Sequence, residues 1–374
     1  MEPGDKVILF TSSTPETVFS ILALCRIGAV ANMINPLFTA DQICDRINET
    51  GAKLLLVLDQ LFEKISGIIQ NTSIEKTVVL SAFQEMPVAL RLAACLKKRT
   101  NIPYSDIVIS WNKFLNGTAI PKNTDDFPYE KDYPLIMVYS SGTTGASKGI
   151  VLTNDGINAT ISNYENGDFF YNRGDSFLQI IPVWFSTGIV LSVLMPLRIG
   201  ITVILEPIFS KESFAQDLRK YHPNMTLAAT SLWTYAVQSN TLKKCDLSSL
   251  KYPITGGEQV LPRVEVSING FLKEHGCNSP LLKGYGMCEL GSTVSTDSQV
   301  HRKAGATGFP IIGVTVAAFD METDHELRYG ERGEIRVLSL ARMKEYFQKP
   351  EATNNYFYID EFTTLSFTGS TSAL

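Results

Sequence analysis

The residues best suited to chemistry lie in one short run, from Tyr139 to Gly149, which is dense in serine, threonine and glycine and contains Lys148. Glycines let backbone N–H groups converge on an anion, while hydroxyls and a lysine add hydrogen bonds and charge. The pattern predicts a polyphosphate-binding loop. Its predicted ligand-binding residues are Ser140, Ser141, Gly142, Thr143, Thr144, Gly145, Ser147 and Lys148.

The spacing of this loop differs from that of a Walker A loop, which places lysine directly after a glycine and opens a helix. Here the apolar runs Leu135–Tyr139 and Ile150–Leu152 flank the loop, which indicates a hairpin-like clamp between two strands. A surface turn is the alternative for a loop of this composition.

Two further glycine-rich turns follow predicted strands. Gly256, Gly257 and Glu258 come after Tyr252–Thr255, and a second turn comes after Leu281–Lys283. Because ligands bind beyond the carboxyl ends of strands in an open α/β sheet, both turns are well placed for a site. Taken singly, such turns are structural in most proteins. The second turn contains Gly284, Tyr285, Gly286, Met287, Cys288 and Glu289.

Residues of these turns suit a nucleotide and a metal ion. Tyr285 can stack on a flat base, and Glu289 can coordinate Mg²⁺, a hard cation that binds carboxylate oxygens together with phosphate oxygens. These residue types allow a nucleotide and a metal ion at the two turns without requiring either.

The run Ser140–Gly149, with Val151–Asn154 behind it, closely resembles the phosphate-binding signature of the adenylate-forming (ANL) superfamily of AMP-dependent synthetases and ligases. The turns at Gly256–Glu258 and Gly284–Glu289 resemble two later motifs of that superfamily and occur in the same order. The run Met343–Thr353 resembles a later landmark of the superfamily. The resemblance extends from Pro3 to Tyr358 and is greatest to acyl-CoA synthetases.

This resemblance implies roles for individual residues. It implies catalytic roles for Lys148 and Thr144 at the phosphates, and a catalytic and metal-binding role for Glu289. Cys288 stands where the superfamily has a phosphate-binding threonine, and a thiol is the weaker donor. The implied ligands are ATP or AMP, Mg²⁺ and, as co-substrate, CoA.

The substrate side is assigned by position within the same resemblance. Trp184 and Phe185 lie in the superfamily's aromatic substrate motif, with Phe185 where a histidine is usual. They are expected to line an acyl pocket, although plain core packing explains them nearly as well. The expected pocket residues are Trp184, Phe185, Thr187, Gly188 and Thr230.

The implied activity is MgATP-dependent conversion of a carboxylic acid, a fatty or other acyl acid, to acyl-AMP and then acyl-CoA. Ser370 stands where the superfamily has a ribose-binding aspartate, and neither the hinge nor the small mobile C-terminal domain is recognisable in the sequence. Met1 resembles a point well inside family members. We therefore expect this chain to be incomplete for turnover. Two alternatives remain, a domain that loads a carrier protein and a nucleotide-binding remnant without turnover.

Composition narrows the partners and the compartment. A net charge of −5 lacks the basic excess that nucleic-acid binding needs, so we expect small-molecule partners and no nucleic acid. The six cysteines form no CxxC pair, which favours a reducing cytoplasm. Neither a secretory signal nor an apolar run long enough to span a bilayer is recognisable.

Alternating strand and helix patterns predict an α/β fold of two subdomains with mostly parallel sheets, followed by a small β-barrel-like region. A strand is expected at Lys6–Phe10, and helices are expected after Thr14 as N-cap, after a capping box of Thr39 and Gln42, and near 60–70 and 187–197. The predicted division is a first α/β subdomain at 1–133, a second at 134–300 that carries the nucleotide site, the small β region at 301–360 and an irregular tail at 361–374.

Overall fold

The structure is a computed structural model that describes residues 1–82, 101–117, 126–140, 147–207, 209–360 and 363–369. Its contacts divide the chain into two compact units. The first contains Met1–Ser147, Pro182–Phe185 and Leu205–Ile208. The second contains Lys148–Ile181, Ser186–Ile204 and Phe209–Leu374.

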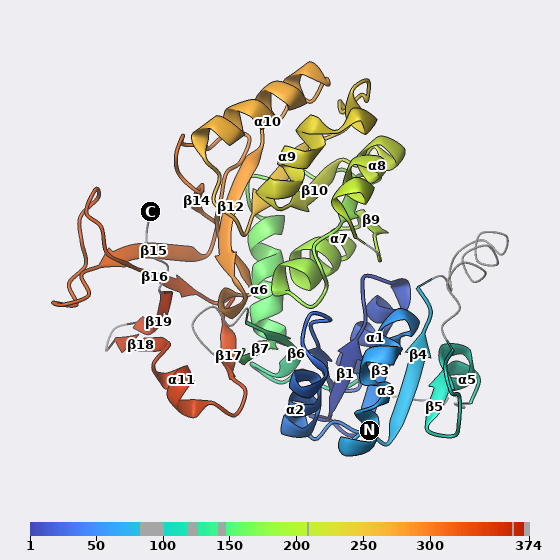
Figure 1. Cartoon of the computed structure of the whole chain (residues 1–374). Coiled ribbons are helices and arrows are strands. Elements are labelled where there is room, and N and C mark those ends of the chain that lie inside the picture. The colour runs from blue at the N-terminus through green and yellow to red at the C-terminus, as the bar shows by residue number, and fades with distance from the viewer. Residues whose placement is uncertain (83–100, 118–125, 141–146, 208, 361–362, 370–374) are drawn as a thin grey trace. The chain divides into compact units, whose positions relative to one another are not determined.

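The first unit is built on parallel strands in the order β6-β2-β1-β3-β4-β5 (Figure 1). The strands are rich in Val, Ile and Leu and are largely buried, as expected for a parallel sheet covered on both faces. Their bounds are β1 Lys6–Phe10, β2 Val30–Met33, β3 Leu54–Leu58, β4 Lys76–Leu80, β5 Val108–Ser110 and β6 Pro134–Tyr139.

Helices of the first unit begin and end at the residues that the sequence indicates. Thr14 caps α1 (Pro15–Arg26), and Thr39 and Gln42 form a capping box at the start of α2 (Ala40–Thr50). The predicted helix near 60–70 is only partly correct, because the segment breaks into short turns. These are η1 Asp59–Leu61, α3 Phe62–Ser66 and η2 Ile69–Asn71. A further helix of this unit, α5 Trp111–Asn116, follows β5.

The main sheet of the second unit has the strand order β14-β13-β12-β11-β10-β8-β9. Strand β10 pairs in parallel with β8 and β11, and β11 pairs in parallel with β12, whereas β13 pairs antiparallel with both β12 and β14. The bounds are β8 Ser176–Gln179, β9 Thr202–Leu205, β10 Met225–Ala228, β11 Tyr252–Gly256, β12 Leu282–Met287, β13 Ser292–Thr296 and β14 Phe309–Pro310.

Helices α8, α9 and α10 pack side by side over this sheet (Figure 1). Trp233 on α9 is fully buried, and its indole N–H donates to the carbonyl of Ile254 on β11 at 3.0 Å. The predicted helix at 187–197 is a π-helix, η3, that passes into α7. The bounds are α6 Asn154–Glu165, η3 Thr187–Leu194, α7 Met195–Arg198, α8 Lys211–Tyr221, α9 Thr230–Gln238, η4 Asn240–Leu242 and α10 Pro262–Glu274.

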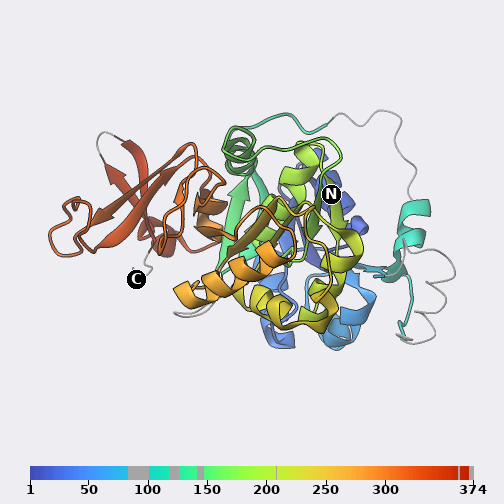
Figure 2. The ribbon, with the colours of Figure 1, turned by 90° about the horizontal axis from the view of Figure 1, so that it is seen from above.

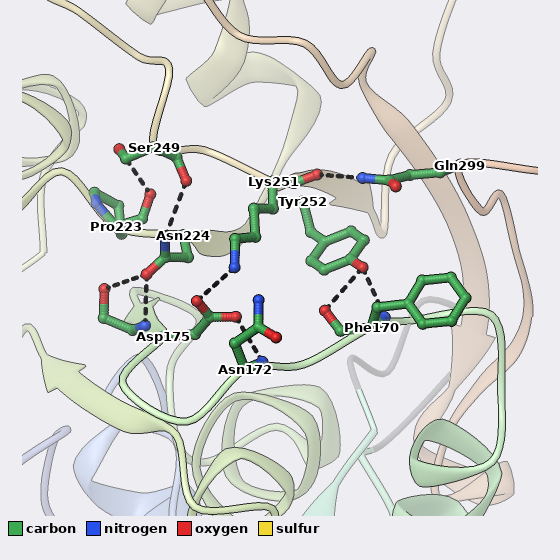
Figure 3. Close-up of polar contacts among 10 residues, drawn as sticks. Phe170, Asn172, Asp175, Pro223, Asn224, Ser249, Lys251, Tyr252 and Gln299 are labelled. Carbon is green, nitrogen blue, oxygen red and sulfur yellow. Dashed lines mark hydrogen bonds and ion pairs between the residues drawn. The ribbon is translucent and has the colours of Figure 1, made fainter.

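A polar network fixes the segment before β8 against the first residues of β11 (Figure 3). Lys251 pairs with Asp175 at 2.6 Å, and the hydroxyl of Tyr252 donates to the Phe170 carbonyl at 3.1 Å and accepts from its N–H at 2.7 Å. Asn224 accepts from the Ser176 N–H at 2.9 Å. These bonds hold the end of the sheet opposite to the glycine motifs.

A four-stranded antiparallel sheet, red in Figure 2, follows in the order β15-β16-β19-β18. The barrel-like expectation is corrected here, because the described strands form an open sheet with β15 and β18 as its edges. Separately, β17 pairs antiparallel with β7. The bounds are β7 Gly149–Thr153, β15 Val314–Phe319, β16 Glu334–Ser339, β17 Met343–Tyr346, α11 Pro350–Asn354, β18 Phe357–Asp360 and β19 Thr363–Gly369.

Candidate functional site

Strands β11 and β12 bring the two later glycine motifs together, because Gly256 lies directly opposite Gly284 in the parallel register. The expectation that the second strand ends at Lys283 is wrong, since β12 continues through Met287 as the partner of β13. Gly286 is required there, because a Cβ at this position would lie 1.6 Å from the carbonyl oxygen of Ser292.

The turn after β11 is anchored to the start of α9. Gly257 has a φ of 79°, a left-handed conformation that glycine adopts without strain. The two carboxylate oxygens of Glu258 accept hydrogen bonds from the Ser231 N–H at 2.9 Å and from its hydroxyl at 3.0 Å. A carboxylate at a helix N-terminus is favoured by the helix dipole, so Glu258 has a structural role that fixes this turn.

Lys148 and Glu289, two charged residues of the second unit, both contact the side chain of Tyr346. Its hydroxyl donates to Oε1 of Glu289 at 2.9 Å, and the Nζ of Lys148 lies 4.7 Å from the centre of its ring. Glu289 is on the short 3₁₀ helix η5, Cys288–Leu290, which follows β12, and Lys148 immediately precedes β7. The structure therefore brings Lys148 and Glu289 to one tyrosine.

Cys288 and Tyr285 lie beside this group. Burial raises the pKa of the Cys288 thiol, which keeps it in the neutral S–H form and available only as a weak donor. Tyr285 is half-buried and packs against the apolar cluster of Leu290, Val294 and Val337. Part of its ring therefore belongs to the core, and part remains exposed.

The phosphate loop is described only at its ends. In the first unit, the Ser147 hydroxyl donates to the Ser140 carbonyl at 2.6 Å, which ties the two ends of the loop together. Ser141, Gly142, Thr143, Thr144 and Gly145 lie outside the described residues, as does Ser370. The hairpin-like clamp and the ribose-side substitution therefore stay predictions.

The predicted substrate residues divide between the units. In the first unit, the rings of Trp184 and Phe185 lie 6.3 Å apart between centroids. In the second unit, Thr187 shares a 2.9 Å hydrogen bond with Ser292, and Gly188 is buried in η3. Thr230 is also buried, with its hydroxyl 3.1 Å from that of Thr255, so both threonines have structural hydrogen bonds.

A sequence model described as "AMP-binding enzyme" matches residues 1–347, nearly the whole chain. The chain belongs to this family. Among curated relatives, 4-coumarate–CoA ligase 3 of Arabidopsis thaliana is 24% identical over 359 residues, which cover 94% of this chain and 59% of that protein. The probable 4-coumarate–CoA ligase 3 of Dictyostelium discoideum is 23% identical over 97% of this chain and 64% of its own length. The chain thus spans about three fifths of these relatives.

Solved structures place the fold among CoA ligases. A long-chain-fatty-acid–CoA ligase from Archaeoglobus fulgidus superimposes with a TM-score of 0.81 at 21% identity, covering 98% of this chain and 69% of that one. An anthranilate CoA ligase in complex with anthranoyl-AMP gives 0.83 at 18% identity, covering 98% and 68%. These likenesses confirm the α/β fold, and the family match confirms the adenylate-forming superfamily.

The donors of this AMP-binding enzyme chain fit a magnesium ion that is held mainly by substrate. Within the described ranges no three His, Cys, Asp or Glu side chains group as a metal cage. Glu289 offers one carboxylate, of which Oε1 is hydrogen-bonded by Tyr346. Mg²⁺ commonly binds through one or two carboxylates together with phosphates and water, so a single glutamate suits it.

Sequence reasoning missed Tyr346 as a site residue, although the surrounding run Met343–Thr353 was recognised as a family landmark. Only the pairing of β17 with β7, in which Tyr346 lies opposite Ile150, brings it to Lys148.

In the described part of the chain no helix is long and apolar enough to cross a membrane.

Proposed function

We propose that this chain binds MgATP and takes part in activating a carboxylic acid as an acyl-adenylate, which then passes to CoA. The observation that carries the proposal is the convergence of Lys148 and Glu289 on Tyr346, together with the pairing of Gly256 and Gly284 on β11 and β12. These elements supply a cation, a hard-metal ligand and partly exposed glycine backbone where the parallel pairing of β11 with β12 ends.

In the proposed reaction the carboxylate oxygen of the acid attacks the α-phosphorus of ATP, and pyrophosphate leaves. Lys148 and Thr144 would stabilise the charge on the phosphate oxygens, which is a positioning and electrostatic contribution. Bound Mg²⁺ would neutralise phosphate charge, and Glu289 would hold it. Tyr285 would pack on adenine with its exposed part, and Cys288 would give a weak contact to phosphate.

The remaining assignments complete the proposal. The loop residues Ser140 to Lys148 would bind the phosphates, Gly256 to Glu258 would line the adenine, and Trp184, Phe185, Thr187, Gly188 and Thr230 would border the acid. The described cysteines are free thiols, which supports a reducing, cytoplasmic location. The division into subdomains at 1–133, 134–300 and 301–360 is also part of the proposal.

The acid is proposed to be an aromatic or fatty acyl acid, because the relatives are named for 4-coumarate, and the solved structures for anthranilate and long-chain fatty acids. CoA is the proposed acceptor on the same ground. A carrier protein as acceptor would be favoured if the adenylate formed but no CoA thioester appeared while a thiolated carrier domain was acylated.

Exchange of labelled pyrophosphate into ATP tests the proposal across a panel of hydroxycinnamic, aminobenzoic and fatty acids. The proposal predicts exchange that requires one of these acids and that Lys148→Ala abolishes, and this result would correct the sequence-based expectation that the chain is incomplete for turnover. ATP binding by calorimetry without exchange for any acid would instead establish a nucleotide-binding protein without turnover. Absence of both ATP binding and exchange would reject the proposed site.

A further inference from the structure

We propose that Tyr346 is a positioning residue that fixes Glu289 and Lys148 relative to one another before MgATP binds. The inference rests on the proposed function, because it assigns these two groups to metal and phosphate. Its basis is that one side chain serves both, with the hydroxyl on Glu289 at 2.9 Å and the ring face toward Lys148 at 4.7 Å.

The tyrosine is itself held firmly. Its strand β17 pairs with β7, and the Phe347 N–H donates to the Gly149 carbonyl at 2.7 Å, one residue after Lys148. The Tyr346 N–H donates to the Thr353 hydroxyl on α11 at 3.0 Å. Tyr356 packs edge-on against its ring, with centroids 5.7 Å apart. Tyr346 is only 5% exposed, so few rotamers are open to it.

The hydroxyl and the ring have different chemical effects. The hydroxyl of the buried Tyr346 donates to Oε1 of Glu289 at 2.9 Å. A donor that bonds one oxygen of a carboxylate in this way orients the group and leaves its other oxygen available to a hard cation. The ring restrains the ammonium group of Lys148 through its π-face, which does not neutralise the charge that phosphate binding uses.

Two substitutions separate these effects. Tyr346→Phe removes the hydroxyl and keeps the ring, whereas Tyr346→Leu removes both. Tyr329→Phe is the matched control, because it deletes a hydroxyl from a tyrosine of the same unit that is fully exposed. Circular dichroism and thermal midpoints identify any variant that fails to fold. If Tyr346→Leu does not fold, Tyr346→Phe still tests the role of the hydroxyl, because it keeps the ring and its packing.

The measurement is calorimetric titration of ATP, first with a metal chelator and then over a series of Mg²⁺ concentrations. In Tyr346→Phe, the Mg²⁺ concentration that gives half of the maximal enhancement of ATP affinity should rise about tenfold, because Glu289 loses the hydrogen-bond partner that orients it. The ATP affinity measured without metal should stay at the wild-type value. In Tyr346→Leu, metal-free ATP affinity should also fall by about two- to fivefold, through loss of the cation–π contact. Tyr329→Phe should match the wild type.

The outcomes distinguish this inference from the function it rests on. An unchanged Mg²⁺ dependence in Tyr346→Phe overturns the positioning role while the nucleotide site stands. Equal losses of metal-free ATP affinity in both variants overturn the division between hydroxyl and ring. A wild-type chain that binds no ATP rejects the proposed function, and the inference with it.

Discussion

At the scale of single residues, charge and hydrogen-bonding capacity decide what the candidate site can hold. Lys148 and Glu289 have opposite charges, yet both approach Tyr346 by different parts of its side chain. A direct ion pair between them would reduce the charge of both groups. In the proposed site, the contacts with the tyrosine would leave the lysine charge for phosphate and one glutamate oxygen for a metal ion.

Cys288 is the residue whose replacement should improve nucleotide binding. Its thiol is neutral because burial raises its pKa, and a hydroxyl is the stronger donor to phosphate. Cys288→Thr should tighten ATP binding by about three- to tenfold, from one added hydrogen bond of about 0.5–1.5 kcal/mol. Calorimetry checks this, with the exposed Cys25→Thr as control. Unchanged or weaker binding by Cys288→Thr would contradict a phosphate contact at this position.

At the scale of elements, the sequence predicted those parts that local rules determine. The capping box at Thr39 was enough to predict the start of α2, and the strand-like run Lys6–Phe10 was enough to predict β1. Helix caps and buried parallel strands have sequence signals of their own. The continuation of β12 through Gly286 was missed, since its glycines read as a turn. Only the antiparallel partner β13, which lies close against them, accounts for these glycines as strand residues.

The same difference between local sequence signals and long-range contacts explains which parts of the candidate site could be predicted. Gly256 and Gly284 could be placed near one another from the sequence, because both follow predicted parallel strands, although β12 continues beyond Gly284. The position of Tyr346 depends on β17 pairing with β7, a contact between segments nearly two hundred residues apart, for which no local pattern exists.

Gly286→Ala tests the close approach of β12 and β13. A methyl group there would lie 1.6 Å from the Ser292 carbonyl oxygen, so the strands must separate next to η5 and Glu289. The free energy of unfolding of the variant should fall by about 1–3 kcal/mol, as for overpacking, so that the variant unfolds at lower denaturant concentration. It should also bind MgATP more weakly. Chemical unfolding and calorimetry measure the two effects.

Gly270→Ala is the matched control, because Gly270 lies in α10 with no atom within 4 Å of an added Cβ. It should be neutral or stabilise by about 0.4–1 kcal/mol. Similar unfolding curves for Gly286→Ala and the wild type would show that β12 and β13 tolerate the methyl group.

At the scale of the whole molecule, buried tyrosines should limit stability at high pH. Burial raises the pKa of Tyr164 to about 12, and it raises those of Tyr139, Tyr171, Tyr346 and Tyr356 as well. Above about pH 10 the unfolded chain loses protons that the native chain retains, so the free energy of unfolding falls as pH rises. Each such group contributes a slope of about 1.4 kcal/mol per pH unit.

Tyr164→Phe isolates one of these groups. The variant should lose the 2.9 Å hydrogen bond to Thr293 and be less stable at neutral pH, yet its stability should fall less steeply between about pH 10 and 12. Denaturant titrations at several pH values give the slope. A variant with the wild-type slope would mean that Tyr164 ionises normally in the folded protein.

The central claim concerns the whole chain, and following the oxygen atoms of the acid tests it most directly. An acid that supports pyrophosphate exchange, labelled with heavy oxygen in its carboxylate, is incubated with the chain, MgATP and hydroxylamine as the trapping nucleophile. Attack of the carboxylate on the α-phosphorus, followed by attack of hydroxylamine on the acyl carbon, must leave one labelled oxygen in AMP. We predict labelled AMP and unlabelled pyrophosphate by mass spectrometry. Unlabelled AMP, or ADP with label in inorganic phosphate, would contradict adenylate formation.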